Sequence, residues 1–240
     1  WEGLIKSVRA KVKGTKVKIR LGASSGEWKA MVADEAARTT FAKNIKTVLE
    51  KNKLDGIDLD FEWAENEKEY KDYSLAILKM REVLGDKYLF SVSLHPVCYK
   101  ISKEAIEAVD FISLQCYGPS PVRFPIEKYC SDIQMVLEYG IPKEKLVAGV
   151  PFYGVTKDNS KKTEAYFNFV QNGLVTSPAQ NEVIYQGDTY VFDGQDNIRI
   201  KTRYAKEQKL KGMMSWDLAT DLPLSDSRSL LKTMTEELRE

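Results

Sequence analysis

Histidine, cysteine and long apolar runs are all scarce in this chain. His95 is the only histidine among 240 residues, which excludes a metal site with several histidine ligands. A Ser-His-Asp or Cys-His arrangement would have to be built on that one residue. Its position after an apolar run and before Pro96 predicts a structural role instead. No run of eighteen apolar residues is present, so we predict no membrane-spanning segment.

The three cysteines, Cys98, Cys116 and Cys130, are odd in number and lack metal-ligand spacing. One disulfide is compatible with this count, which leaves the redox compartment open. A charge excess is also missing, because 36 Lys and Arg stand against 35 Asp and Glu. This balance gives no electrostatic reason to expect nucleic acid or an anionic membrane as a partner. The chain opens on Trp1 without a signal sequence, so we expect any targeting segment to have been removed or not included.

Short apolar runs alternate with segments of helical period along the chain. Strands are predicted over residues 17–21, 54–61, 89–94, 109–114, 146–150 and 212–216. Helices are predicted between them, and a last amphipathic helix over residues 227–238. A spacing of roughly 30–40 residues between strands predicts parallel βαβ units. The length suits one (β/α)₈ barrel and the 43% hydrophobic residues can fill its core, so we predict a single domain over residues 1–240.

One interval interrupts this alternation. Residues 155–205 form a polar stretch with two strand-like pieces of its own, Glu182–Tyr185 and Thr189–Phe192. We predict a small α+β excursion on one barrel loop, since the stretch is too short for a separate domain.

The most informative segment is the strand predicted over residues 54–61 and the acids that it carries. Its period of two places Asp58, Asp60 and Glu62 on one face and three apolar residues on the other. On a central barrel strand the acidic face is the interior near the C-terminal mouth, where such barrels carry their active sites. Crowded like charges in a partly dry site raise the pKa of at least one carboxyl group, so that it holds a proton at neutral pH. General acid catalysis requires such a group.

Two other interpretations of these acids are a calcium loop and a solvated edge strand. A calcium loop needs glycine at its sixth position and polar residues between its acids, whereas Gly56 precedes Asp58 here and the intervening residues are apolar. A fully solvated acidic face fits poorly with Leu54 before the acids and Trp63 after them. The pattern therefore favours a general acid.

This segment resembles a signature of glycoside hydrolase family 18, the chitinase and endo-β-N-acetylglucosaminidase family. Residues 55–62 match the D-G-x-D-x-D-x-E pattern of that family's fourth strand at every specified position. Four other segments resemble the helix ahead of that strand and strands six, seven and eight, and they are Arg38–Ile45, Val109–Tyr117, Gly149–Gly154 and Gly212–Trp216. The resemblance covers nearly the whole chain and implies a TIM (β/α)₈ barrel.

The resemblance also implies the chemistry. The nucleophile would be the 2-acetamido carbonyl of the substrate, with net retention and an oxazolinium intermediate. Glu62 would be the general acid and then the base, Asp60 would orient and polarise the acetamido group, and Asp58 would share a proton with Asp60. No metal and no cofactor is implied.

Four further residues would contact the substrate. Tyr117 would hydrogen-bond the developing oxazolinium ion, and Trp216 would form the hydrophobic floor under the distorted sugar. Gln115 and Tyr153 are the other predicted substrate-binding residues.

Two segments depart from the family pattern. Many family chitinases have M-x-Y-D at strand six, whereas residues 115–118 read Q-C-Y-G. The Q-x-Y arrangement is similar to that of plant-type class III chitinases and of several endo-β-N-acetylglucosaminidases. We therefore expect the loss of the aspartate to shift substrate choice without abolishing catalysis. Strand three usually ends S-x-G-G, and Leu21–Ser25 matches this only loosely.

The start of the chain is the larger departure. Residues 1–10 resemble the helix that precedes strand three, so the first two βα units are expected to be absent. A barrel without two strands exposes edges and an apolar interior. We therefore expect a partial sequence, or missing strands that are supplied from elsewhere.

The resemblance implies hydrolysis of β-1,4 linkages after N-acetylglucosamine in chitin or chitooligosaccharides. The alternatives are an endo-β-N-acetylglucosaminidase that acts on N-glycan cores, a non-catalytic glycan-binding relative, which would typically lack the acid supplied by Glu62, and an inactive fragment. The expected partner is an oligo- or polysaccharide that contains N-acetylglucosamine, bound by a monomer. This substrate class implies an extracellular, cell-surface or periplasmic location.

Overall fold

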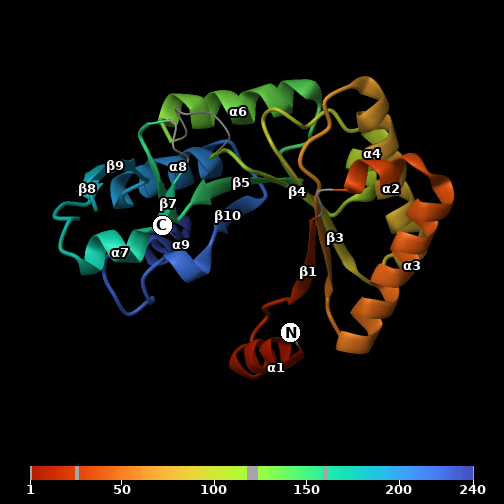
Figure 1. Cartoon of the computed structure of the whole chain (residues 1–240), viewed down its shortest axis with the longest axis horizontal. Coiled ribbons are helices and arrows are strands. Elements are labelled where there is room, and N and C mark those ends of the chain that lie inside the picture. Colours follow the sequence, from red (N-terminus) through yellow and green to blue (C-terminus); the bar gives the residue numbers. More distant parts are fainter. Residues whose placement is uncertain (1, 25–26, 118–123, 159–161, 240) are drawn as a thin grey trace. The chain divides into compact units, whose positions relative to one another are not determined.

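A computed structural model describes residues 2–24, 27–117, 124–158 and 162–239 (Figure 1). Contacts within the chain divide it into two compact units, residues 1–112 and 113–240. All six predicted strands are present, as β1 (Arg20–Ser24), β2 (Gly56–Asp60), β3 (Leu89–Leu94), β4 (Phe111–Leu114), β5 (Leu146–Pro151) and β10 (Gly212–Trp216). Strand β4 begins in the first unit and ends in the second.

In the first unit, β2 pairs in parallel with β1 on one side and with β3 on the other. This register places Gly22 of β1 and Ser91 of β3 beside Asp58. Helices α3 and α4 pack on each other alongside these strands (Figure 1). The helices of this unit are α1 (Glu2–Lys11), α2 (Trp28–Ala33), α3 (Glu35–Asn52), α4 (Glu67–Leu84) and α5 (Lys103–Ala108).

The apolar face of β2 forms part of the core. Ile57 and Leu59 are fully buried, and Phe61 lies beyond them in the same alternation. The Phe61 ring packs against Trp28 of α2 and Tyr73 of α4, with centroids 5.4 Å apart in both pairs. Burying a side chain of this size stabilises the fold by about 1.5–3 kcal/mol. The predicted period of two is confirmed for this face of the strand.

Side-chain caps define the ends of the two long helices. The Asp34 carboxylate accepts a hydrogen bond from the third residue of α3 at 2.7 Å, and Asn66 caps α4 in the same way at 3.0 Å. Lys53 closes α3 in a left-handed conformation, with φ 52°. Asn66, the N-cap of α4, lies four residues after Glu62. The segment that carries Glu62 between β2 and α4 is therefore short.

Strand β1 begins three residues later than predicted. Val17 and Lys18 are exposed. The backbone N–H of Ile19 donates to the Asp55 carboxylate at 2.8 Å, and the ladder with β2 starts only at Arg20. The Asp55 side chain thus binds the backbone N–H of Ile19, which would pair with β2 if β1 were longer.

In the second unit, β5 and β10 pair in parallel, with Pro151 opposite Trp216. Helices α8 and α9 pack on each other, and Arg203 of α8 forms an ion pair with Glu237 of α9 at 2.9 Å. Among the described residues, no helix is both long and apolar enough to cross a membrane. The helices of this unit are α6 (Ile126–Tyr139), α7 (Tyr166–Gln171), α8 (Gln195–Glu207), α9 (Leu230–Arg239) and the short 3₁₀ helix η1 (Leu218–Thr220).

The excursion predicted over residues 155–205 forms a separate antiparallel sheet with α7 beside it. The strand order is β7–β6–β9–β8, and residues 159–161 lie outside the described part. Phe169 of α7 is buried against the rings of Tyr185, Tyr190 and Phe192. The strands are β6 (Tyr153–Thr156), β7 (Thr163–Ala165), β8 (Glu182–Tyr185) and β9 (Asp188–Val191).

The last helix starts at Leu230, whereas the sequence pattern predicts Ser227. The Asp221 carboxylate, on the segment before it, accepts hydrogen bonds from the backbone N–H groups of Leu230 and Leu231 at 2.9 and 2.8 Å. The Ser229 hydroxyl donates to the same carboxylate at 2.9 Å. A cap from outside the helix therefore sets its first residue.

The three cysteines are unpaired with one another, and the single histidine is buried in the fold. Cys98, Cys116 and Cys130 are free thiols, so the disulfide that their number allows is not formed. Burial raises the pKa of the Cys116 thiol to about 12. His95 is buried, its Nδ1 accepts from a backbone N–H, and its ring lies 5.2 Å from that of Trp63.

Candidate active site

Asp58 lies in the middle of β2 and is held by two hydroxyl donors of β3 and by the charge of an arginine on β1. Its Oδ2 accepts a hydrogen bond from the Ser93 hydroxyl at 2.7 Å, and its Oδ1 accepts one from the Ser91 hydroxyl. The guanidinium of Arg20 on β1 approaches the same carboxylate, with Nη1 3.9 Å from Oδ1. Asp60 follows at the last position of β2, opposite Ser24 of β1, and is half-buried.

Arg20, Ser91 and Ser93 belong to no recognised motif and are not among the predicted site residues. Their signal in the sequence is a partial alternation, because Ser91 and Ser93 in β3 lie two positions apart, as the acids of β2 do, and Arg20 lies on the same face of β1. Residues paired across neighbouring strands lie on the same face of the sheet. An acidic strand beside two such strands therefore predicts a polar layer on that face.

Glu62 lies two residues beyond the end of β2, and its side chain is exposed. Its backbone carbonyl accepts a hydrogen bond from the indole Nε1 of Trp28 at 2.9 Å. Two residues later, the backbone N–H of Ala64 donates to the Cys98 Sγ at 3.1 Å. The backbone at Glu62 is thus anchored while its carboxyl group reaches solvent, as a proton donor to a ligand must.

Trp63 carries an unsatisfied donor directly after Glu62. Its indole N–H is buried and has no hydrogen-bond partner among the described residues. Such a group costs about 1–3 kcal/mol when it is left unpaired. Within the described ranges, no group of three or more His, Cys, Asp or Glu side chains is arranged to hold a metal ion.

The predicted residues of the second unit begin with Gln115 and Tyr117, which follow β4. Both are buried. The Tyr117 hydroxyl donates to the Met214 sulfur at 3.8 Å, and its ring meets that of Tyr153 edge-on with centroids 6.3 Å apart. The structure therefore brings Tyr117 and Tyr153 together, while Gly118 of the Q-x-Y-G segment lies outside the described residues.

Trp216 ends β10, and 56% of its surface is exposed. Met214, two residues earlier and on the same face of the strand, contacts Tyr117. Strand β5 allows this packing, because a Cβ added to Gly149 would come within 3.0 Å of the Tyr117 ring. The exposed indole and the Tyr117–Tyr153 pair therefore lie on one side of β10.

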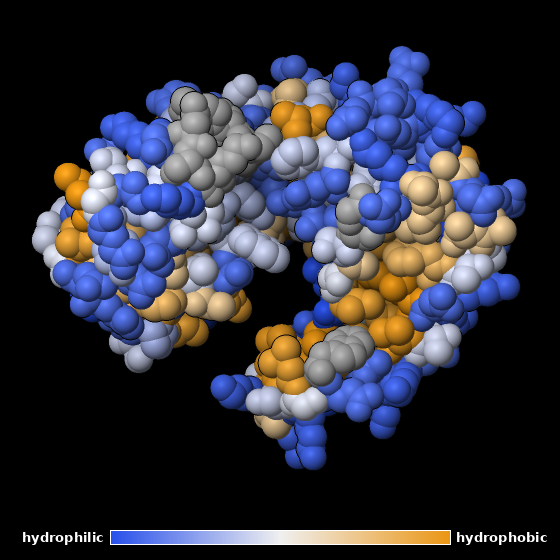
Figure 2. Space-filling model, viewed as in Figure 1, coloured by the Kyte–Doolittle hydropathy of each residue, from blue (hydrophilic) through white to orange (hydrophobic). Residues whose placement is uncertain are grey.

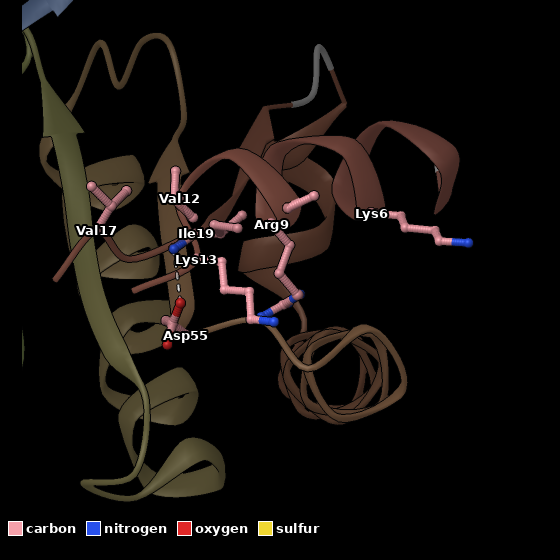
Figure 3. A pocket seen from close by; sticks show the side chains of 8 residues that line it. Lys6, Arg9, Val12, Lys13, Val17, Ile19 and Asp55 are labelled. Carbon is pink, nitrogen blue, oxygen red and sulfur yellow. Dashed lines mark hydrogen bonds between the residues drawn. The ribbon is translucent and has the colours of Figure 1, made fainter. Parts of the chain in front are cut away.

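A cavity of about 490 Å³ opens elsewhere in the first unit, beside α1 (Figure 3). Lys6, Arg9 and Lys13 line it with apolar residues and with Asp55, which accepts from the N–H of Ile19 (Figure 3). Asp55 precedes β2, whereas Glu62 follows it. The cavity therefore lies at the opposite strand ends from Glu62 and is separate from the acids.

Comparison with known families decides the classification. The family model of Glycosyl hydrolases family 18 matches residues 3–221. The chain belongs to glycosyl hydrolase family 18.

Family 18 relatives share about a quarter of the sequence or less. A probable chitinase 2 from Drosophila melanogaster is 23% identical, over 86% of this chain and 56% of its own length. Chitinase A1 from Niallia circulans is 23% identical, over 88% of this chain and 42% of its own length. The chain thus spans about half the length of these two relatives.

Solved structures establish a family 18 chitinase-like fold. A chitinase from Bacteroides thetaiotaomicron gives a TM-score of 0.86 at 22% identity, over 97% of this chain and 80% of its own. A chitinase-like agglutinin from Robinia pseudoacacia gives 0.81 at 19% identity, over 98% and 84%. A class V chitinase from Nicotiana tobaccum in complex with NAG4 gives 0.80 at 16% identity, over 98% and 84%.

Within this family 18 chain, the predicted acids belong to the first unit. The second unit holds Gln115, Tyr117, Tyr153 and Trp216. The catalytic and binding roles of all seven residues stay predictions, as do the single domain over 1–240 and the absence of the first two βα units.

Proposed function

We propose that this family 18 chain is a retaining glycoside hydrolase that cleaves β-1,4 linkages after N-acetylglucosamine in chitin oligosaccharides. The observation that carries the proposal is the acid row of β2, in which Asp58 is held by its neighbours, Asp60 ends the strand and Glu62 follows it, exposed. The chitinases among its relatives support this substrate class, and the Nicotiana tobaccum enzyme is in complex with NAG4.

In the first step, the Glu62 carboxyl group donates its proton to the glycosidic oxygen as the bond from that oxygen to C1 breaks. The carbonyl oxygen of the substrate's own acetamido group forms a bond to C1 from the other face, which gives an oxazolinium ion. In the second step, Glu62 accepts a proton from water while the water oxygen attacks C1, and the bond from C1 to the acetamido oxygen breaks and restores the amide. Two inversions leave the configuration retained.

Asp60 and Asp58 support the acetamido group in this proposal. Asp60 contacts and orients the amide so that its oxygen faces C1. Asp58 lies behind Asp60 in the strand and contacts the sheet instead of the sugar. Tyr117, Gln115, Tyr153 and Trp216 remain predicted contacts of the sugar, by the family resemblance.

The second candidate is an endo-β-N-acetylglucosaminidase that cuts the core of N-glycans. The sequence at Gln115–Tyr117 favours it, because the Q-x-Y arrangement resembles several enzymes of that type. The chemistry at Glu62 would be the same in both cases, and only the substrate would differ.

The test compares wild-type protein with Glu62→Gln on a chitin tetramer and on an N-glycosylated protein in parallel. General acid–base catalysis contributes about 10²- to 10⁴-fold to a rate, so we expect a loss of that size on whichever substrate is cleaved. Release of reducing ends measures the first substrate, and a mass shift of the glycoprotein measures the second.

Glu67→Gln is the matched control, because Glu67 is also exposed but lies in the first turn of α4. It should retain wild-type turnover. Binding of the tetramer without any product from wild-type protein would contradict hydrolysis and favour a glycan-binding protein, a class to which the structural likeness to an agglutinin also points.

A further inference from the structure

The hydrogen bonds around Asp58 have a fixed direction. An arginine side chain can only donate, and the Arg20 Nη1 donates to the Ser91 hydroxyl oxygen. A serine hydroxyl has one proton to give, and Ser91 gives it to Oδ1 of Asp58. Ser93 donates to Oδ2 at 2.7 Å. Both oxygens of Asp58 are therefore acceptors, which is the pattern of an ionised carboxylate.

The charge of Arg20 has few other partners. Its side chain is 26% exposed, and its guanidinium carbon lies 4.6 Å from the centre of the Phe111 ring. Burial lowers the pKa of Arg20, while the carboxylates of Asp58 and Asp110 act in the opposite direction. Asp110 already pairs with Arg81, whose Nη2 lies 2.9 Å from its Oδ2. Asp58 is thus left as the principal counter-ion of Arg20.

The other groups near the pair do not replace this counter-ion. Burial and the charges of Asp58 and Asp60 raise the pKa of Tyr73 well above its usual value, so this residue stays neutral. Its hydroxyl donates to the backbone carbonyl of Leu59 at 3.4 Å. Its ring packs on Phe61, on the face of β2 opposite to Asp58. In the part of the chain that the structure describes, Arg20, Asp60 and, beyond the end of the strand, the exposed Glu62 are ionisable side chains on the same face as Asp58.

We propose that Arg20 is a positioning residue, which acts through Ser91 to hold Asp58 as a fixed carboxylate, so that the proton shared by Asp58 and Asp60 resides on Asp60. The proposal rests on the proposed function, in which Asp60 contacts the acetamido group. An ionised Asp58 favours a proton on its neighbour, because two adjacent carboxylates repel each other. A protonated Asp60 still offers its carbonyl oxygen to the N–H of the acetamido group, which becomes more acidic as the oxazolinium cation forms. No bond is made or broken in this step, and only the place of one proton is set.

Three variants of the full chain test the role of Arg20. Arg20→Met removes the charge and the donor at similar length, Arg20→Lys keeps a cation that can donate to Ser91, and Ser91→Ala interrupts the relay. On the cleaved substrate, we expect Arg20→Met to lower kcat at least about tenfold while KM stays within about threefold, since the residue does not touch the sugar. Arg20→Lys should recover most of the lost kcat, and Ser91→Ala should lie between the two.

Arg9→Met is the matched control. Arg9 also bonds within the first unit, to the backbone carbonyls of Asn52 and Lys53, but it lines the cavity beside α1. Its kcat should equal that of wild type. The thermal unfolding midpoint of each variant shows whether a lower kcat comes from unfolding of the protein or from displacement of Asp58 in a folded protein. Wild-type kcat in Arg20→Met, or an equal loss in Arg20→Met and Arg20→Lys when both remain folded, would overturn the proposal.

A spectroscopic measurement tests the same idea without turnover. In protein labelled at the aspartate carboxyl carbon, the signal that is lost in Asp58→Asn identifies Asp58. At about pH 5 it should have the shift of a carboxylate in wild type and move toward the protonated position in Arg20→Met. An Asp58 signal at the protonated position in wild type would overturn the proposal. If Glu62→Gln and wild type prove equally inactive, the proposed function fails, and this measurement still decides the role of Arg20.

Discussion

Trp28 determines where the backbone of Glu62 lies. Its indole N–H donates to the Glu62 carbonyl at 2.9 Å, and its ring stacks on that of Phe61 with an angle of 9° between the planes. Phe61 is the last apolar residue of the β2 alternation, so the stack links the acid to the core. A residue of α2 that no motif includes therefore positions the proposed general acid.

Trp28→Phe should reduce activity more than it disturbs the core. Phenylalanine keeps most of the ring contact with Phe61 but leaves the Glu62 carbonyl without this donor. A hydrogen bond of this kind, which is only partly buried, contributes about 0.5–1.5 kcal/mol of unfolding free energy. We expect a loss of that size in urea denaturation, together with a kcat about 3- to 10-fold lower as the acid loses its position.

Tyr73→Phe is the control for this substitution. It removes a hydroxyl from the same aromatic cluster, but that hydroxyl bonds to Leu59 instead of Glu62. Its kcat should stay at the wild-type value. An equal fall of kcat in both variants would show that general loosening of the cluster, and not the hydrogen bond to Glu62, is responsible.

Among the elements, the second unit contains a helix that hydrophobic periodicity did not predict. The buried residues of α8 follow helical spacing, but three of them, Gln195, Lys201 and Thr202, are polar. The Lys201 ammonium is fully buried and pairs with Asp193 at 2.5 Å. Burial raises the pKa of Asp193 while the charge of Lys201 opposes the rise. A buried stripe built on an ion pair is invisible to a pattern of apolar residues.

The same reasoning explains which other elements could be predicted. Strands β3 and β10 have the predicted bounds because serine is the only polar residue type that interrupts their apolar residues. Strands β6 and β7 and helix α7 lie in the polar excursion, where pairing within a small antiparallel sheet decides the structure. At the candidate site, the acids of β2 follow from their spacing. Arg20 and Ser91 do not, because their role depends on the parallel register that brings three strands together.

Lys201→Met should therefore destabilise the second unit strongly. It removes one partner and leaves Asp193 buried with Asn197 as a hydrogen-bond donor at 3.1 Å. Breaking a buried ion pair on one side costs about 3–5 kcal/mol, whereas replacing both partners by apolar residues is often neutral. Urea denaturation should show a loss of that size for Lys201→Met and a smaller one for Lys201→Met with Asp193→Leu. A double variant as unstable as the single one would mean that packing, and not the uncompensated charge, causes the loss.

At the scale of the whole molecule, charge is balanced, and hydrophilic side chains cover much of the visible surface (Figure 2). The net charge is +1, and 36 cationic residues stand against 35 acidic ones. Among the described residues, most ion pairs have at least one solvent-exposed partner, such as Lys68 with Asp72 and Lys157 with Glu182. Family 18 membership and this balance lead to the same expectation, which is a neutral sugar as the ligand.

Binding of a chitin tetramer should for this reason depend little on ionic strength. A ligand without charge gains nothing from the surface potential, and the screening length falls from about 14 to about 4 Å between roughly 0.05 and 0.5 M salt. Calorimetry with the Glu62→Gln protein, which should bind without cleavage, should give dissociation constants within about twofold across this range. A Kd that rises more than about fivefold with salt would mean that charged groups carry the affinity. That result would contradict a neutral substrate and would favour an anionic glycan as the ligand. Lys18 and Lys29 of the first unit, whose side chains are 60% and 35% exposed, would then be the first candidates for contacts with it.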